Sequence, residues 1–222
     1  MTAPPAYDAH ADWYEDYTAI ASSYMDRVRV HLADLLGPGS GSCLDLCCGG
    51  GAHAATIRGL GWTPVGVDLS QGQLRWAKGR LPAVAGDATR LPLRDGSVPA
   101  VACVLAHTDL PDYAAVLREA ARVLVPGGRL VHVGVHPCFV GAFADRSDAD
   151  LITINTRYAE TARTFDAWAP HGVRARVGAW HVPLADLLNA VVDAGLRIDR
   201  VAESSPNGIA DTFAFRAVRV RS

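Results

Sequence analysis

The chain has 222 residues, half of them hydrophobic, and this length and composition predict one domain with a core of ordinary size. Its 21 basic and 23 acidic residues give a formal charge of −2, which excludes the strongly basic field that binding to a phosphate backbone relies on. The N-terminus lacks a basic segment followed by an apolar one, and no run of about eighteen apolar residues occurs. We therefore expect a cytoplasmic protein, a monomer or homodimer, that binds neither nucleic acid nor membranes.

Five cysteines form an odd set with no C-x-x-C pair and no matching histidine spacing. This pattern predicts free thiols, with neither a disulfide framework nor a metal site. The alternative is a soft-metal or arsenic site built from Cys47, Cys48 and Cys138, because all three can lie near strand ends. Small buried cysteines in the core are the favoured interpretation.

The first 41 residues form an aromatic, amphipathic segment that stops at the glycine-rich run 37–41. We predict one or two helices followed by a linker. Residues 1–41 are interpreted as a helical cap that closes over a ligand site, with Tyr14 facing that site. The alternative is a helix whose aromatic side chains only pack against the rest of the fold.

The stretch 42–58 predicts a buried strand, a tight turn and a helix. A short apolar run contains Asp45, three glycines follow at 49–51, and the segment from Ala52 has helix-forming composition. Glycine in such a turn lets a ligand approach the backbone, and a positive φ costs it nothing. The following helix directs its free N–H groups into the same space, which favours a carboxylate or phosphate there.

Two further short strands also end in an acid. Asp68 lies roughly twenty residues after the glycine turn, at a distance that lets a strand-end carboxylate take both hydroxyls of a ribose. The alternative for Asp68 is a solvated acid that only caps the helix starting near Ser70. Asp87 follows the next strand in a G-D-A context, so acids end three successive strands.

The rest of the chain predicts a mainly parallel sheet. The continuous apolar run 98–106 is typical of a central parallel strand, and a helix with an apolar stripe follows and ends at the P-G-G turn 126–128. We expect the fifth strand over 129–135. The runs 196–203 and 212–220 alternate apolar and polar residues and are joined without a helix, so they predict an antiparallel pair.

The segments 44–51 and 122–130 resemble the first motif and the late R-V-L-x-P-G-G motif of class I S-adenosylmethionine (SAM)-dependent methyltransferases, of the type-11-like, small-molecule kind. Cys47 stands where that family usually has glycine. The resemblance implies an α/β fold with a Rossmann-like seven-stranded sheet of order 3-2-1-4-5-7-6, its last strand antiparallel, behind the N-terminal helical cap. The methyltransferase domain is then residues 42–222, with a substrate lid inserted at 139–180 around scattered aromatics that include Trp168.

The resemblance also implies SAM as the cofactor, no metal, and a small-molecule acceptor. In this family the residues at the third acid hold adenine, which assigns that role to Asp87 and the backbone N–H of Ala88. The expected cofactor-binding residues are Tyr14, Asp45, Cys47, Gly49, Gly51, His53, Asp68, Leu69, Asp87, Ala88 and Ala106.

Methyl transfer from SAM is an in-line displacement, so the protein mainly aligns the reactants and excludes water. His107 and His136 lie at the predicted carboxyl ends of central strands, where ligands of open α/β sheets bind, and they are the first candidates for a general base. His181 is the next candidate. Two alternatives remain open: a SAM-binding protein without methyl transfer, acting as a scaffold or pericyclic catalyst, and an NAD(P)-dependent oxidoreductase, whose G-x-G-x-x-G fingerprint fits only loosely.

Overall fold

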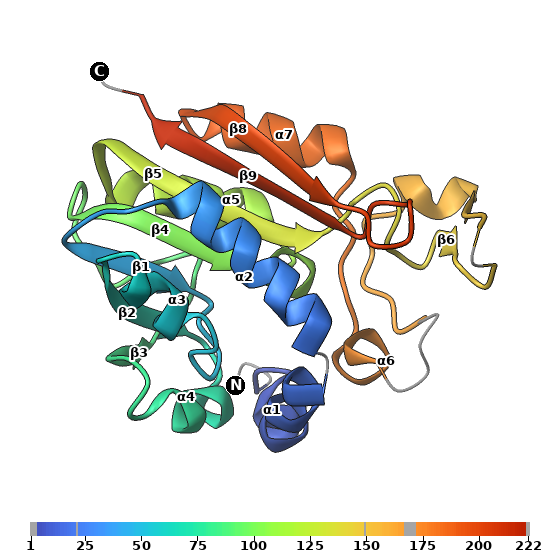
Figure 1. Cartoon of the computed structure of the whole chain (residues 1–222), viewed down its shortest axis with the longest axis horizontal. Coiled ribbons are helices and arrows are strands. Elements are labelled where there is room, and N and C mark those ends of the chain that lie inside the picture. The colour runs from blue at the N-terminus through green and yellow to red at the C-terminus, as the bar shows by residue number, and fades with distance from the viewer. Residues whose placement is uncertain (1–3, 21, 149, 167–171, 221–222) are drawn as a thin grey trace.

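Seven strands form one sheet in the order β3-β2-β1-β4-β5-β9-β8 in the computed structural model, which describes residues 4–20, 22–148, 150–166 and 172–220 (Figure 1). The first five strands run parallel, and β9 runs antiparallel to both of its neighbours. The predicted strand order and terminal hairpin are therefore confirmed. The strands are β1 (Ser42–Leu46), β2 (Thr63–Asp68), β3 (Ala83–Ala85), β4 (Val98–Val104), β5 (Leu124–Val135), β8 (Leu196–Ser204) and β9 (Thr212–Arg219).

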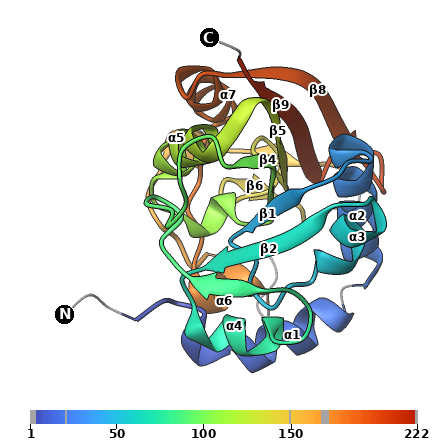
Figure 2. The same cartoon turned by 90° about the vertical axis from the view of Figure 1, so that its left-hand side faces the viewer.

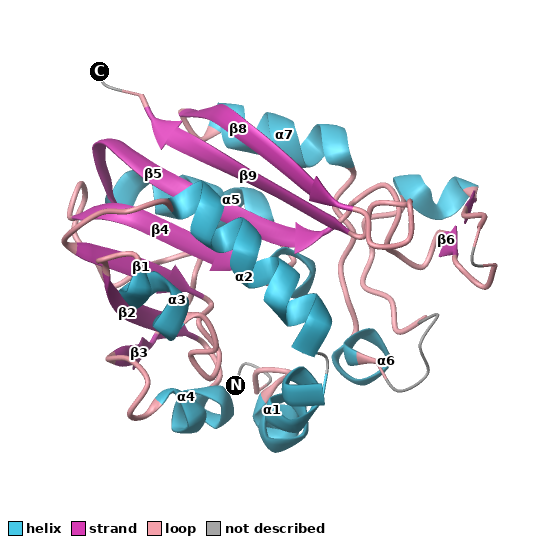
Figure 3. Cartoon of the chain, viewed as in Figure 1, coloured by secondary structure: helices cyan, strands magenta, loops and turns pink. Residues whose placement is uncertain are grey.

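Helices cover both faces of this sheet (Figures 2 and 3). Side chains alternate along each strand, so that β4 sends Val101 and Cys103 to one face and Ala100 and Ala102 to the other. The first face packs against α5 (Tyr113–Val123) and α7 (Leu184–Asp193), and the second packs against α2 (Ser22–Leu36) and α3 (Ala54–Gly59). Apolar burial on both faces explains why the central strands read as continuous hydrophobic runs.

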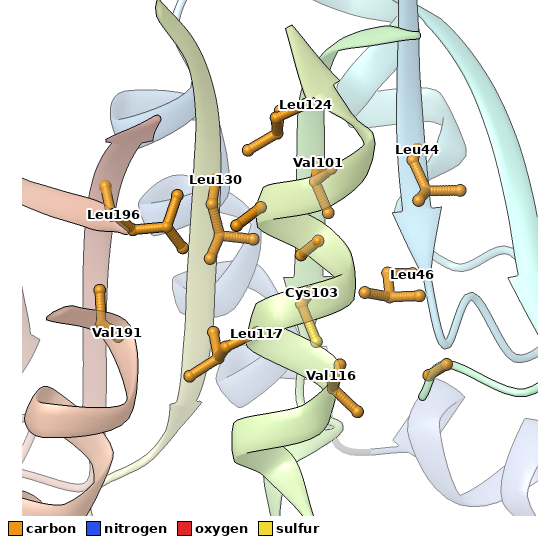
Figure 4. Close-up of a cluster of buried hydrophobic side chains, with 14 of the residues drawn as sticks. Leu44, Leu46, Val101, Cys103, Val116, Leu117, Leu124, Leu130, Val191 and Leu196 are labelled. Carbon is orange, nitrogen blue, oxygen red and sulfur yellow. The ribbon is translucent and has the colours of Figure 1, made fainter. Parts of the chain in front are cut away.

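The larger core cluster shows how the two layers meet (Figure 4). Leu44 and Leu46 of β1 lie beside Cys103 of β4, and Val116 of α5 lies near them, whereas Leu117 points toward Leu130 of β5. These side chains are at most 1% exposed, so each leucine contributes about 1.5–3 kcal/mol of burial free energy. The packing of α5 fixes the carboxyl end of β4, where the candidate site begins.

The P-G-G segment differs from its prediction. Helix α5 ends at Val123, and β5 begins at Leu124 rather than at residue 129, so Pro126 to Gly128 lie inside the strand. Gly127 has a φ of 81°, and a Cβ on Gly128 would lie 2.8 Å from the Val125 carbonyl oxygen. The tight turn within the strand therefore requires glycine, and it coincides with the register shift between β4 and β5.

The N-terminal segment consists of a 3₁₀ turn η1 (Asp8–His10), helix α1 (Ala11–Ile20) and helix α2. Helix α1 lies beside α4 (Gln71–Ala77), below the carboxyl ends of the strands (Figure 1). In the described part of the chain, no helix is long and apolar enough to cross a membrane.

The described residues of the predicted lid, 139–180, form short elements. They are β6 (Ala144–Asp145), β7 (Thr153–Ile154), the 3₁₀ turn η3 (Thr156–Ala159) and α6 (Val173–Val177). The 3₁₀ turn η2 (His107–Asp109) follows β4, and residues of this turn line a pocket together with residues of the lid. Trp168, one of the aromatics on which the lid prediction rests, lies outside the described residues.

Candidate cofactor and acceptor site

The glycine turn after β1 is held by the acid at the end of β2. The backbone N–H of Gly49 donates to Asp68 Oδ2 at 2.8 Å, and the N–H of Ser70 donates to Asp68 Oδ1 at 2.8 Å. Gly49 and Gly51 have φ values of 51° and 79°, and a Cβ on Gly51 would collide with Leu81. The three glycines therefore permit a tight turn that places bare backbone at the end of β1.

Cys47 begins this turn with a φ of 58°, a left-handed conformation that favours glycine. Its side chain packs against the buried cluster below the turn. A hydrogen bond with the Cys103 thiol, together with burial, raises the Cys47 pKa well above its usual range. The thiol is therefore protonated at neutral pH, and the cysteine acts as a small packing residue there.

A cavity of about 200 Å³ lies over the glycine turn, between the strand ends and α1. It brings together most of the residues that the sequence predicts for the cofactor, although Asp45 and Gly51 do not line it. The predicted residues in its wall are Tyr14, Cys47, Gly49, His53, Asp68, Leu69, Asp87, Ala88 and Ala106.

Asp45 does not lie in the wall of this cavity. Its side chain is 1% exposed, and its Oδ2 has no hydrogen-bond partner among the described residues. Burial raises the pKa of Asp45 to about 7, and the charge of Asp68 adds to the shift. Asp45 is therefore expected to affect the cofactor site indirectly and not as a direct ligand.

Asp68 and Asp87 differ in their surroundings. Burial raises the pKa of Asp68, while its bonds to the N–H groups of Ser70 and Gly49 oppose that shift. The exposed carboxylate of Asp87 accepts from the backbone N–H and the hydroxyl of Thr89, so it also stabilises its own turn. Each carboxylate retains lone pairs that can accept bonds from a ligand.

The sequence analysis missed Gln73, which lies in the first turns of α4. This side chain is 3% exposed and lines the cofactor cavity, yet neither its Nε2 nor its Oε1 has a partner in the described structure. A Cβ on Gly49 would lie 3.5 Å from its Oε1. A buried amide without partners beside bare backbone fits a ligand with polar donor and acceptor groups, such as the amino-acid part of SAM.

A second, larger cavity of about 540 Å³ adjoins the first. Its walls come from the N-terminal segment, the ends of β4 and β5, and the predicted lid. Tyr7, Tyr14, Tyr17 and Tyr24 of the N-terminal segment line it, and so does Arg174 of α6, whose Nε has no partner among the described residues. This cavity is a candidate acceptor site whose wall combines aromatic and aliphatic side chains with polar and charged ones, among them Arg146 and Asp148.

Asp109 lies in the walls of both cavities. The hydroxyl of Tyr7 donates a hydrogen bond of 3.2 Å to Asp109 Oδ2. Burial raises the pKa of Asp109 to about 7, while the Tyr7 hydrogen bond opposes that shift. The sequence gives no strong signal for this residue, because its partner Tyr7 lies 102 positions earlier in the chain.

Of the three histidines predicted as bases, His107 and His181 line one smaller pocket and His107 also lines the larger cavity, whereas His136 lies apart from them. The His107 ring is 2% exposed and packs against His132 at a centroid distance of 5.0 Å, and burial lowers its pKa to about 4. His136 accepts from the Cys138 N–H through Nδ1 and pairs with Glu203 at 2.8 Å through Nε2, and it lines neither cavity. His181 lies in a smaller pocket beside Phe143.

Comparison with known proteins identifies the family. A family model described as a methyltransferase domain matches residues 44–132. A demethylmenaquinone methyltransferase of Mycolicibacterium paratuberculosis is 34% identical over 206 residues, which cover 91% of this chain and 84% of that protein. The chain therefore belongs to the class I SAM-dependent methyltransferases, and SAM is their cofactor.

Other relatives match a shorter part of this chain. Demethylmenaquinone methyltransferases of Mycolicibacterium vanbaalenii and Mycobacterium sp. (strain KMS) are 44% and 39% identical, but the matches span only 41% and 56% of either partner. The chain thus spans about half the length of these relatives.

Solved structures agree on the fold. An S-adenosylmethionine dependent methyltransferase from Mesorhizobium loti superimposes with a TM-score of 0.70 at 22% identity, covering 87% of this chain and 96% of that one. The [4+2]-cyclase SpnF superimposes with a TM-score of 0.64 at 18% identity, covering 89% of this chain and 81% of that one.

Proposed function

We propose that this protein transfers a methyl group from SAM to a small, partly apolar organic acceptor by in-line displacement. The observation that carries the proposal is the contact between the two cavities, which have seven wall residues in common. A donor held over the glycine turn and an acceptor held in the larger cavity would meet at that common wall. Such alignment, with water excluded, is the main contribution that a protein makes to this reaction.

The residues of the smaller cavity divide between the parts of the cofactor. Gln73 and the backbone of the glycine turn would hold its amino-acid part, and Asp68 would accept from the ribose hydroxyls. Asp87 and the N–H of Ala88 would hold adenine. SAM supplies a methyl group already activated by a sulfonium, and the helical cap of residues 1–41 would limit access of water to it.

The acceptor is proposed to contain a flat apolar ring. Four tyrosines line the larger cavity and can stack on such a ring or contact its edge. The names of the relatives, demethylmenaquinone methyltransferases, support the same chemistry. We further propose that the chain acts in the cytoplasm, as a monomer or homodimer, without nucleic acid or membrane as partner.

A second candidate is a protein that binds SAM without transferring its methyl group. Cys47, in a backbone conformation and at a position where the family usually has glycine, narrows the floor of the cofactor cavity. The similarity to the [4+2]-cyclase SpnF supports this candidate at the level of fold.

The experiment that tests the proposal is a mass-spectrometric screen. The protein is incubated with SAM and a set of small aromatic hydroxyl compounds, among them 1,4-dihydroxynaphthalene, and products gaining one methyl group are sought together with S-adenosylhomocysteine. The matched control is Asp68→Ala. Binding of SAM in calorimetry without any methylated product favours the second candidate, and failure to bind SAM contradicts both.

A further inference from the structure

Seven residues line both cavities, and one of them carries a charge. Asp109 is the charged residue, and the rest of this common wall is neutral: Tyr7, Tyr14, Thr18, Met25, Leu105 and Gly178. Asp109 ends the short turn η2, and its N–H donates to the Ala106 carbonyl at 2.9 Å, which ties it to the end of β4. A titratable group is therefore fixed in the wall through which donor and acceptor must meet.

The surroundings of this carboxyl leave its charge poorly compensated. Its one side-chain hydrogen bond in the described structure comes from the neutral hydroxyl of Tyr7, and no described arginine lies within ion-pair distance of it. Burial dominates, so its pKa rises to about 7. The titratable and charged groups that act on it or respond to it are Tyr7, Tyr14, Cys47, Asp68, Arg163 and Arg174.

A methyl donor must present its methyl group to the acceptor cavity, so its positively charged sulfur belongs near the common wall. We propose that Asp109 responds to this charge: binding of SAM drives the proton off its carboxyl, whereas binding of the uncharged product S-adenosylhomocysteine does not. Asp109 would then help the site to distinguish substrate from product. This inference rests on the proposed function, because it requires SAM to occupy the smaller cavity.

Calorimetry at pH about 6.5 tests the inference without any acceptor. SAM and S-adenosylhomocysteine are each titrated into the protein in two buffers of different ionisation enthalpy, and the difference gives the protons released. The two ligands share all other titratable groups, so their difference isolates the sulfonium charge. A carboxyl with a pKa of about 7 is mostly protonated at this pH, so SAM should release more than half a proton more than its product.

Variants identify the residue that releases this proton. In Asp109→Asn the difference between the two ligands should vanish while both still bind. The matched control is Asp148→Asn, a carboxyl that lines the acceptor cavity alone, and it should keep the difference. If the difference persists in Asp109→Asn, the titrating group is another one, such as Asp45, and the inference is wrong.

Tyr7→Phe provides a second route in case Asp109→Asn does not fold, which circular dichroism would show. Loss of the Tyr7 hydrogen bond should raise the pKa of Asp109 further. Binding of SAM should then release the Asp109 proton over a pH range that extends higher than in the parent protein. If both ligands release equal numbers of protons from the parent protein, the inference is wrong but the proposed function still stands. Absence of binding by either ligand overturns the proposed function and the inference with it.

Discussion

At the residue scale, Asp109 and His107 compete for the role of general base. The turn η2 contains both, but His107 packs into the sheet, where a Cβ on Gly134 would overlap its ring. Its Nδ1 has no partner among described atoms, and a pKa of about 4 leaves it a weak base near neutral pH. Asp109, with a pKa of about 7, has the basicity that general-base catalysis favours.

We therefore expect Asp109→Asn to lower turnover by about a hundredfold or more and to abolish the acidic limb, below pH about 7, in the pH profile of kcat/KM for SAM, which reports the free enzyme. In the parent protein the acceptor's proton would move to Asp109. The freed electron pair would form the bond to the methyl carbon, and the electrons of the former carbon–sulfur bond would stay on sulfur. The matched variant is His107→Gln, which should keep that limb. Loss of the limb in His107→Gln alone would restore the base role to His107.

Asp68 is expected to dominate cofactor affinity. Asp68→Ala would remove the proposed ribose contacts and the bond from the Gly49 N–H, at a cost of about 2–4 kcal/mol in SAM binding. Calorimetry measures this loss. Asp87→Asn, which keeps an acceptor and lies on the exposed surface, should lose less. Equal affinity of the parent protein and Asp68→Ala would contradict the placement of SAM in this cavity.

At this scale, what the sequence predicts depends on local spacing. The strand ends at Asp68 and Asp87 and the glycine turn follow from short-range patterns, and the structure places these residues around one cavity. The wall shared with the acceptor cavity does not follow, because Tyr7 and Asp109 meet across 102 positions. Spacing also cannot show that the His136 ring is engaged on both nitrogens, since Glu203 reaches it from β8.

At the element scale, polar contacts hold the N-terminal segment to α4. Asp8 Oδ1 accepts from the Ser70 hydroxyl at 2.6 Å and from the Gly72 N–H at 3.0 Å. Glu15 of α1 pairs with Arg80 at 2.6 Å, and Arg80 also donates to the Gly50 carbonyl at 3.0 Å. The cap and the glycine turn are thereby connected through one arginine.

Gly72→Ala should loosen this connection. Its Cβ would lie 2.8 Å from the Asp8 carbonyl oxygen, so the segment around Asp8 must shift. We expect SAM to dissociate several times faster and amide hydrogen exchange in α1 to increase. The matched control is Gly59→Ala, because a Cβ there meets nothing within 4 Å. Unchanged dissociation in Gly72→Ala would show that the cap does not retain the cofactor.

Elements with strong periodicity follow from the sequence, while their ends depend on tertiary packing. The apolar stripe of α5 predicts the helix, but Leu124 leaves it for an extended conformation because its side chain packs in the core cluster with β4. The elements of the lid are harder to predict, because its strands β6 and β7 pair through two residue pairs. Such small contacts leave little periodic signal in a sequence.

At the scale of the whole molecule, buried acids and histidines act on stability in opposite directions. Asp45 and Asp109 keep their protons to pH about 7 in the folded chain, but lose them near pH about 4 when unfolded. Between these values they lower the free energy of unfolding as the pH rises. His53 and His107, with pKa values of about 4, raise it between pH about 4 and 6.5 because the unfolded chain binds more protons.

Asp45→Asn should therefore gain stability over the parent protein as the pH rises from about 4 to 7, on the order of 1–3 kcal/mol. Urea unfolding at pH about 5 and about 8 measures the change. Asp150→Asn, at an exposed position, is the matched control. A difference that stays constant across this range would contradict a raised pKa at Asp45.

The single charge in the wall common to both cavities has a further consequence, for inhibition of the enzyme by its own product. Coupling between two ligands is reciprocal. If SAM binding expels a proton from Asp109, protonation of Asp109 must weaken the binding of SAM, while it leaves the binding of S-adenosylhomocysteine unaffected. Acidification would then tilt the competition toward the spent cofactor. At a fixed ratio of SAM to S-adenosylhomocysteine, a growing fraction of the protein would therefore hold the product, and its activity would fall, as the pH drops below about 7.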